Sequence, residues 1–182
     1  MTDDGKILAQ LIKPAATVPL EEEYGKHILT LREPQAPDST VTVRNVPADT
    51  VAIKVDAFTA PDAVFNGGHG ECKRADYVLI SPEQRTIVYI EVKRTRDGLA
   101  DIVKQLKGAQ CFVSYCREVG RSFWDEARFL DEYRHRFVSI GHTTLAKRKT
   151  QVQRPASRHD SPSAPLKIDW PHHIQFNQLA GA

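Results

Sequence analysis

Two neighbouring apolar segments joined by a short turn constrain the fold of this chain more than any other feature. Residues 75–80 and 86–93 are rich in β-branched and aromatic side chains, and residues 81–85 have the composition of a turn. The second segment is apolar on both of its faces up to Glu91, which is typical of a strand that is buried on both sides. The sequence therefore predicts a β-hairpin whose second strand does not lie at a solvated edge.

The alternation of side chains along strands places three charged groups on one face of this hairpin. If Ile80 pairs with Ile87, the antiparallel register brings Asp76 opposite Glu91, about 5 Å away, and Lys93 follows on the same face. The two carboxylates repel each other there, and the apolar surroundings add a desolvation cost. A bound cation, a shared proton or the ammonium group of Lys93 would offset this repulsion.

These three groups are the parts that phosphodiester cleavage needs. A hard divalent cation takes oxygen ligands from one or two carboxylates, from water and from phosphate. Such an ion polarises the phosphorus centre and lowers the pKa of its bound water, while a lysine positions the nucleophile and stabilises negative charge. We therefore expect Asp76 and Glu91 to bind Mg²⁺ or Mn²⁺, and Lys93 to be catalytic.

The same hairpin resembles the PD-(D/E)XK nuclease superfamily. Its signature, an acid on one strand and Glu-x-Lys at the end of the next, matches Arg74-Ala75-Asp76-Tyr77-Val78-Leu79-Ile80 followed by Ile87-Val88-Tyr89-Ile90-Glu91-Val92-Lys93. The resemblance covers roughly residues 18–142. It implies an α/β, restriction endonuclease-like fold with an α-β-β-β-α-β core, in which helices flank a mixed central sheet. It also implies that the backbone carbonyl of Val92 is a metal ligand.

The match to the superfamily has departures. Ala75 stands where the signature has proline, and the literal Pro61-Asp62 lies in the loop-like segment 59–70 and ranks lower. In the exonuclease and repair members the next helix carries a glutamine and, one turn later, a tyrosine. Here Gln105 is present, and the resemblance implies a catalytic role for it, but Ala109 replaces the tyrosine.

The superfamily often uses one more acid, a glutamate from the first core helix. Residues 19–31 are expected to form this helix, because Pro19 suits a first helical position and Leu20, Tyr24, His27, Ile28 and Leu31 form an apolar stripe. Glu21 and Glu23 flank that stripe and are the candidates for the additional acid. The sequence does not choose between them.

Hydrophobic periodicity and turn residues predict the remaining elements. Other helices are expected at residues 5–13, 97–117 and 123–133, and other strands at residues 40–44, 51–56 and 137–141, with a further edge strand around 171–177. A helix between the third and fourth core strands implies that some neighbouring strands are parallel.

Composition divides the chain into three parts. Residues 1–146 are expected to form the nuclease-like domain, residues 147–165 a basic linker rich in proline and serine, and residues 166–182 a C-terminal extension. The first hundred residues carry 12 Lys+Arg and 15 Asp+Glu, whereas the rest carry 13 and 8, a balance compatible with binding a polyanion. Residues expected to bind nucleic-acid phosphates are Arg94, Arg96, Lys104 and Lys107.

Cysteine usage indicates a reducing compartment. Cys72, Cys111 and Cys116 lack the paired spacing of a disulfide framework or a structural zinc site. His69 and Glu71 match the His-x-Glu of zinc deaminases, but the chain lacks the downstream Pro-Cys-x-x-Cys. No segment approaches the ~20 apolar residues of a membrane span, and the first residues do not resemble a secretory signal. We expect a cytoplasmic protein without a membrane partner.

Together these patterns predict a metal-dependent nuclease that hydrolyses DNA, with RNA left open, in a defence, mobile-element or repair context by analogy with the superfamily. The alternative is a non-catalytic nucleic-acid-binding or regulatory module on the same fold. An enzyme for a small phosphate ranks last, because residues 66–70 lack the lysine of a phosphate-binding loop. Sequence specificity would come from loops, a homodimer partner or a larger complex, since 182 residues leave little room for a separate reading domain.

Overall fold

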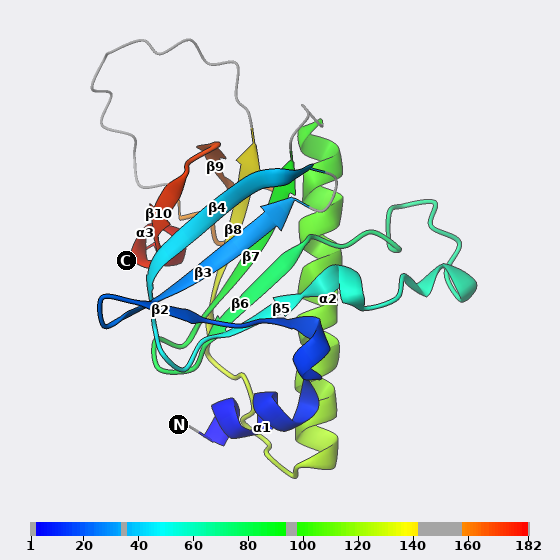
Figure 1. The fold of residues 1–182 in the computed structure, drawn as a ribbon. Coiled ribbons are helices and arrows are strands. Elements are labelled where there is room, and N and C mark those ends of the chain that lie inside the picture. The colour runs from blue at the N-terminus through cyan, green and yellow to red at the C-terminus, as the bar shows by residue number, and fades with distance from the viewer. Residues whose placement is uncertain (1–2, 34–35, 94–97, 142–157, 182) are drawn as a thin grey trace.

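The computed structural model describes residues 3–33, 36–93, 98–141 and 158–181. Within these residues two mixed β-sheets pack against each other, and a long helix covers the outer face of the larger sheet (Figure 1). The chain is therefore of the mixed α/β class, as predicted. The smaller sheet was not predicted, and it covers the face of the central sheet on which the resemblance implies a helix.

The larger sheet has six strands in the described residues. Their spatial order is β1 (Thr17–Val18), β5 (Val51–Lys54), β6 (Tyr77–Ser81), β7 (Thr86–Lys93), β8 (Arg134–Gly141) and β9 (Leu166–Asp169). Strands β5, β6 and β7 are antiparallel, whereas β8 runs parallel to β7 and β9 parallel to β8. Helix α2 (Leu99–Phe123) makes the crossover that two parallel neighbours require.

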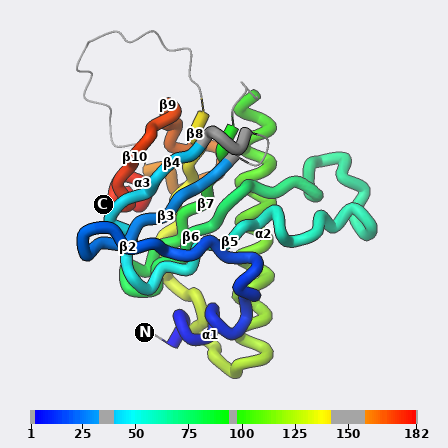
Figure 2. The backbone as a smooth tube through the Cα atoms, viewed as in Figure 1, coloured from blue at the N-terminus to red at the C-terminus, as the bar shows by residue number. Residues whose placement is uncertain are grey.

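The smaller sheet has four strands in the described residues. Their spatial order is β10 (His173–Gln175), β4 (Ala36–Val46), β3 (Lys26–Glu33) and β2 (Glu21–Glu23). Figure 2 shows how the C-terminal segment returns to lie beside β4, although the two are far apart in sequence. The remaining elements are α1 (Asp3–Leu11), α3 (Phe176–Ala180) and the short 3₁₀ turns Pro14–Ala16, Val55–Ala57 and Pro61–Ala63.

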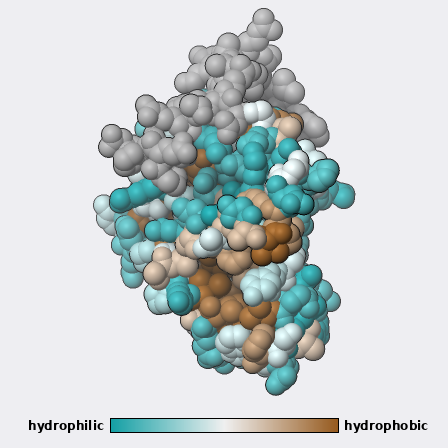
Figure 3. Space-filling view, turned by 90° about the vertical axis from the view of Figure 1, so that its right-hand side faces the viewer, coloured by the Kyte–Doolittle hydropathy of each residue, from teal (hydrophilic) through white to brown (hydrophobic). Residues whose placement is uncertain are grey.

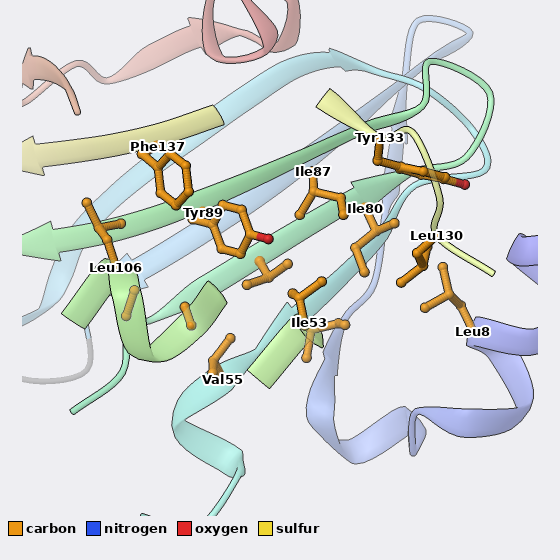
Figure 4. Close-up of a cluster of buried hydrophobic side chains, with 14 of the residues drawn as sticks. Leu8, Ile53, Val55, Ile80, Ile87, Tyr89, Leu106, Leu130, Tyr133 and Phe137 are labelled. Carbon is orange, nitrogen blue, oxygen red and sulfur yellow. The ribbon is translucent and has the colours of Figure 1, made fainter. Parts of the chain in front are cut away.

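Strand alternation divides the buried side chains into two cores. One core lies between the larger sheet and helices α1 and α2 (Figure 4), and the other lies between the two sheets and α3. Along β7, Ile87 and Tyr89 belong to the first core, whereas Val88, Ile90 and Val92 belong to the second. Strand β7 is thus central and buried on both faces, as predicted, and Glu91 does not lie at a solvated edge of the sheet.

The helix predicted over residues 19–31 is wrong, because this segment forms the β2–β3 hairpin. Tyr24 and Gly25 both have positive φ and make the turn between the strands. Leu29 and Leu31 are fully buried at alternate positions of β3, so the segment carries a period of two as well as a stripe near 3.6. Pairing with β4 decides between the two patterns, since β3 hydrogen-bonds along most of its length to that strand.

The helix predicted over residues 123–133 is also wrong. Helix α2 continues to Phe123, and the next ten residues form turns in which Asp125, Leu130 and Glu132 have positive φ. Phe129 is buried in the first core, where its ring lies against Gly120 of α2. Phe129 is therefore buried by packing onto the preceding helix, and its burial does not need a second helix.

Two further expectations concern membranes and segment boundaries. None of the helices in the described part of the chain is long and apolar enough to span a membrane. The predicted boundary at residues 146 and 147, and the linker as far as residue 157, lie outside the described residues.

The partly buried pair Tyr89–His135 gives a prediction for the pH dependence of stability. The Tyr89 hydroxyl and His135 Nδ1 are hydrogen-bonded at 2.8 Å, and burial, with the charges of Arg117 and Arg136, lowers the pKa of His135 below its ordinary value of 6.5. The unfolded chain therefore binds a proton at a higher pH than the folded chain does, so stability falls as the pH drops below the ordinary value. Urea unfolding between pH values of about 7.5 and about 5.5 should show a smaller loss in His135→Gln than in the parent. Equal losses would contradict this assignment.

Candidate active site

Asp76 directly precedes β6, and both its backbone and its side chain are hydrogen-bonded. Its backbone carbonyl accepts a hydrogen bond from the Val55 N–H at 2.9 Å, and its carboxylate Oδ2 accepts one from the Val92 N–H at 2.7 Å. The β6–β7 ladder has the predicted register and ends at the pair Tyr77–Ile90. The Asp76 side chain thus takes up a strand amide just beyond the ladder, and this hydrogen bond holds the carboxylate beside the Glu91–Val92 segment.

Glu91 and Lys93 form an ion pair within β7. Lys93 Nζ lies 3.0 Å from Glu91 Oε1, and the Glu91 side chain is 0% exposed whereas that of Lys93 is 23% exposed. By strand alternation both side chains lie on the face of Tyr89, which α2 covers. Burying a carboxylate is costly unless a cation lies close to it, and the Lys93 ammonium supplies that cation at the more exposed end of the pair.

Strand β8 adds a polar residue that the sequence analysis missed. Ser139 is the register partner of Glu91 and is buried on the same face of the sheet. The next partner on that face, opposite Lys93, is Gly141, where a side chain would begin only 3.0 Å from the Lys93 carbonyl oxygen. The signal for Ser139 was a polar residue in the otherwise apolar run 137–140.

The first turn of α2 supplies a second missed residue, Asp101. Its carboxylate pairs with the Lys73 ammonium, and this hydrogen bond, with the positive charges of Lys73, Lys93 and Lys104, lowers the pKa of Asp101. Asp101 therefore lies in the same electrostatic neighbourhood as Lys93, and the N-terminal end of α2 borders the site. The signal was an acid in the first turn of the helix that follows Glu-x-Lys.

Gln105 lies one turn further along α2. Its side-chain oxygen Oε1 is buried and has no hydrogen-bond partner among the described residues. Buried polar atoms are normally hydrogen-bonded, so this oxygen is expected to accept a hydrogen bond from a water molecule or a ligand. Nearby, Gly108 allows α2 to touch the backbone that leads to Asp76, because a Cβ at this position would lie 1.7 Å from the Lys73 carbonyl oxygen.

The structure does not bring Glu21 and Glu23 to these residues. Both lie on β2 of the smaller sheet, and Glu23 forms a 3.2 Å ion pair with Arg44. Figure 1 shows β2 far from the N-terminal end of α2, which borders the site. Their expected position depended on the helix over residues 19–31, which is absent.

The expected phosphate-binding residues divide into two groups. Arg94 and Arg96 lie outside the described residues. Lys104 and Lys107 are exposed on α2, and the charge of Lys104 acts on Asp101, one turn before it. The aliphatic stem of Lys104 packs against Gly70, whose φ is +89° and where a Cβ would lie 2.7 Å from the lysine Cδ.

The two alternative motifs occupy the loop that precedes β6. Asp62 is exposed in a 3₁₀ turn. The Glu71 carboxylate accepts hydrogen bonds from the N–H groups of Gly67 and His69 at 2.9 and 2.8 Å, and backbone hydrogen bonds lower its pKa. Glu71 therefore organises its own loop, and nothing in its contacts favours the deaminase-like interpretation.

The donor set decides how well a metal ion fits. No group of three or more His, Cys, Asp or Glu side chains in the described residues is arranged to hold a metal. Asp76 and Glu91 supply two carboxylates, and the Val92 carbonyl would be a backbone donor. Mg²⁺ is commonly bound by one or two carboxylates while it keeps several waters and phosphate oxygens, so two acids suit it better than they suit zinc.

Comparisons with known proteins identify no relative. No protein-family model matches the chain, and no curated protein or solved structure is significantly similar to it.

Proposed function

We propose that this protein is a metal-dependent nuclease that hydrolyses phosphodiester bonds of DNA, with Asp76, Glu91 and Lys93 at its active site. The observation that carries the proposal is the hydrogen bond from the Val92 N–H to Asp76 Oδ2. It places one carboxylate beside the strand position that bears the buried Glu91–Lys93 ion pair. Two acids and an ammonium group at the open end of the β6–β7 hairpin are the groups that such a reaction requires.

The order of the elements supports the same proposal. Helix α1, strands β5, β6 and β7, helix α2 and strand β8 follow one another in the α-β-β-β-α-β order of the restriction endonuclease-like fold, with β1 to β4 inserted after the first helix. Strands β5, β6 and β7 are antiparallel to their neighbours among these three, and β8 runs parallel to β7. In this arrangement α1 is the first core helix, a role that the sequence analysis gave to residues 19–31.

Each residue has a defined task in the proposed reaction. Asp76, Glu91 and the Val92 carbonyl would hold Mg²⁺ or Mn²⁺; when bound, the ion would polarise the phosphate and lower the pKa of a water ligand. Lys93 is more exposed than its ion-pair partner Glu91, so the Lys93 ammonium can contact a phosphate oxygen or the attacking water. Gln105 Oε1 would orient that water, and Lys104 and Lys107 would contact flanking phosphates.

The proposal also includes a cellular compartment and a source of sequence specificity. Cys72, Cys111 and Cys116 are free thiols, which suits a reducing compartment such as the cytoplasm. Sequence specificity, if the nuclease has any, would come from its loops, a second copy of the chain or a larger complex.

Asp76→Asn tests the site, because asparagine keeps an oxygen for the Val92 N–H but removes the carboxylate charge. We expect cleavage of labelled DNA in Mg²⁺ to fall by at least about 100-fold. We also expect the variant to lose the rise in melting temperature that Mn²⁺ gives the parent, since a ligand that binds only the folded state stabilises it. Asp62→Asn is the matched control, because Asp62 is an exposed acid outside the site, and both properties should persist in it.

Two outcomes would overturn this assignment. If Asp76→Asn cuts DNA like the parent, the acid does not take part in the reaction. If the parent retains DNA in a salt-dependent manner but never cuts it in Mg²⁺ or Mn²⁺, the chain is a binding module on this scaffold. Cleavage of RNA in place of DNA would keep the site and change the substrate.

A further inference from the structure

Helix α2, whose first turn borders the candidate site, shares an exposed aromatic surface with the loop before β6. Phe58, Phe112 and Tyr115, here called the aromatic cluster, lie together: the Phe58 ring is 5.1 Å from that of Phe112 and 6.3 Å from that of Tyr115. Phe112 packs against the first core and anchors the cluster, whereas Phe58 is 39% exposed and Tyr115 61% exposed. Two rings are thus held in place and remain open to solvent.

Figure 3 faces the side of the molecule where α2 and this loop lie. Hydrophobic surface gathers across the middle of this face, and hydrophilic surface surrounds it. Isolated exposed apolar side chains are ordinary, but contiguous ones indicate a binding surface. The loop contributes two more exposed apolar side chains, those of Val64 and Phe65.

The same helix connects the aromatic cluster to the candidate site. The charge of Lys93 acts on Asp101 in the first turn of α2, and Phe112 lies eleven residues after Asp101, about 16 Å further along the helix axis. The exposed lysines Lys104 and Lys107 lie between them in sequence. A nucleic-acid strand that runs from the site along α2 would therefore pass the two lysines first and the aromatic rings next.

We propose that the aromatic cluster stacks unpaired bases of the polynucleotide, so that the nuclease takes single-stranded segments as its substrate. Single-stranded nucleic acids bind where basic side chains follow the backbone and aromatic rings stack on the bases. Lys104 and Lys107 supply the charge for the phosphates, and the exposed faces of Phe58 and Tyr115 supply the stacking surface. Duplex DNA keeps its bases in the helix stack and cannot use these rings. This inference deepens the proposed function and rests on it for the position of the reacting phosphate.

Tyr115→Ala tests the stacking surface. Fluorescence anisotropy with a labelled single-stranded oligonucleotide and its duplex, in EDTA so that nothing is cut, gives the dissociation constants. We expect Tyr115→Ala to weaken single-strand binding by at least about fivefold and Tyr115→Trp to restore it, with duplex binding unchanged. Phe123→Ala is the control, because Phe123 is 77% exposed near the end of the same helix and has no ring contact with the cluster.

The outcomes separate this inference from the proposed function. Equal single-strand binding by Tyr115→Ala and the parent overturns the inference, even if Lys93-dependent cleavage is observed. Tyr115-dependent single-strand binding without any cleavage supports the stacking surface and overturns the nuclease proposal. If Tyr115→Ala instead converts a dimer to a monomer in sedimentation velocity and leaves binding unchanged, the cluster is an interface between copies and the inference fails.

Discussion

Replacing Lys93 with methionine is expected to abolish DNA cleavage and to destabilise the fold. The ammonium group lies 3.0 Å from the carboxylate of Glu91, which is fully buried. Removing one partner of a buried ion pair leaves a charge in surroundings that do not solvate it, which costs about 3 kcal/mol. We therefore expect the free energy of unfolding to fall by about this amount, and cleavage to fall by at least about 100-fold because the charge near the phosphate is lost.

Glu91→Gln is the matched variant for Lys93→Met. The two variants differ in whether the charge that remains can reach water. Glutamine keeps the size of the buried side chain but removes its charge, and Lys93, being 23% exposed, can turn towards water. We expect Glu91→Gln to lose cleavage equally but to lose much less stability than Lys93→Met. Urea unfolding of both variants gives the comparison. A larger loss in Glu91→Gln, or normal cleavage by Lys93→Met, would contradict this account of the pair.

Gly108→Ala is the second change with a large expected effect. A Cβ at this position would lie 1.7 Å from the Lys73 carbonyl oxygen and 3.2 Å from the Arg74 Cα, so the backbone that leads to Asp76 must move. Alanine favours helices over glycine by about 1 kcal/mol, and this gain opposes the clash. Overpacking against backbone costs more, so we expect a net loss of about 2 kcal/mol in unfolding free energy. We also expect weaker cleavage, because Asp76 is displaced with Arg74.

Gly98→Ala is the control for this prediction. Gly98 precedes α2, and a Cβ there would have nothing within 4 Å. Its cleavage should remain within about twofold of the parent, and its stability should fall by less than about 1 kcal/mol, because alanine is a poorer N-cap residue than glycine. If Gly108→Ala is as stable as the parent, the close contact of α2 with residues 73 and 74 does not exist in solution. A stable Gly108→Ala variant with normal cleavage would also remove the argument that this contact positions Asp76.

The fold could be predicted from the sequence where one pattern fits a segment, and not where two patterns fit it or where the pairing is distant. The β6–β7 register follows from alternation across a short turn, and Ile80 pairs with Ile87 as predicted. Residues 19–31 fit both a helical stripe and a strand alternation, and only pairing with β4 decides between them. The pairing of β10 with β4 could not be foreseen because the two strands come from opposite ends of the chain.

The candidate site follows the same division. Asp76, Glu91 and Lys93 belong to one hairpin, so strand alternation alone predicts that they lie close together. Asp101 and Ser139 come near them only through the crossover helix and the parallel pairing of β7 with β8, which spacing in sequence does not specify. Gln105 was named through resemblance, and its buried oxygen is a finding of the structure.

The most direct test of the proposed site is to look for the metal ion itself. A crystal soaked in Mn²⁺ should show an anomalous peak between the carboxylates of Asp76 and Glu91, with ligand distances on the order of 2.2 Å, and the peak should be absent in Asp76→Asn. A saturating soak that leaves the position between these side chains without a peak, or places the ion elsewhere, would contradict the account.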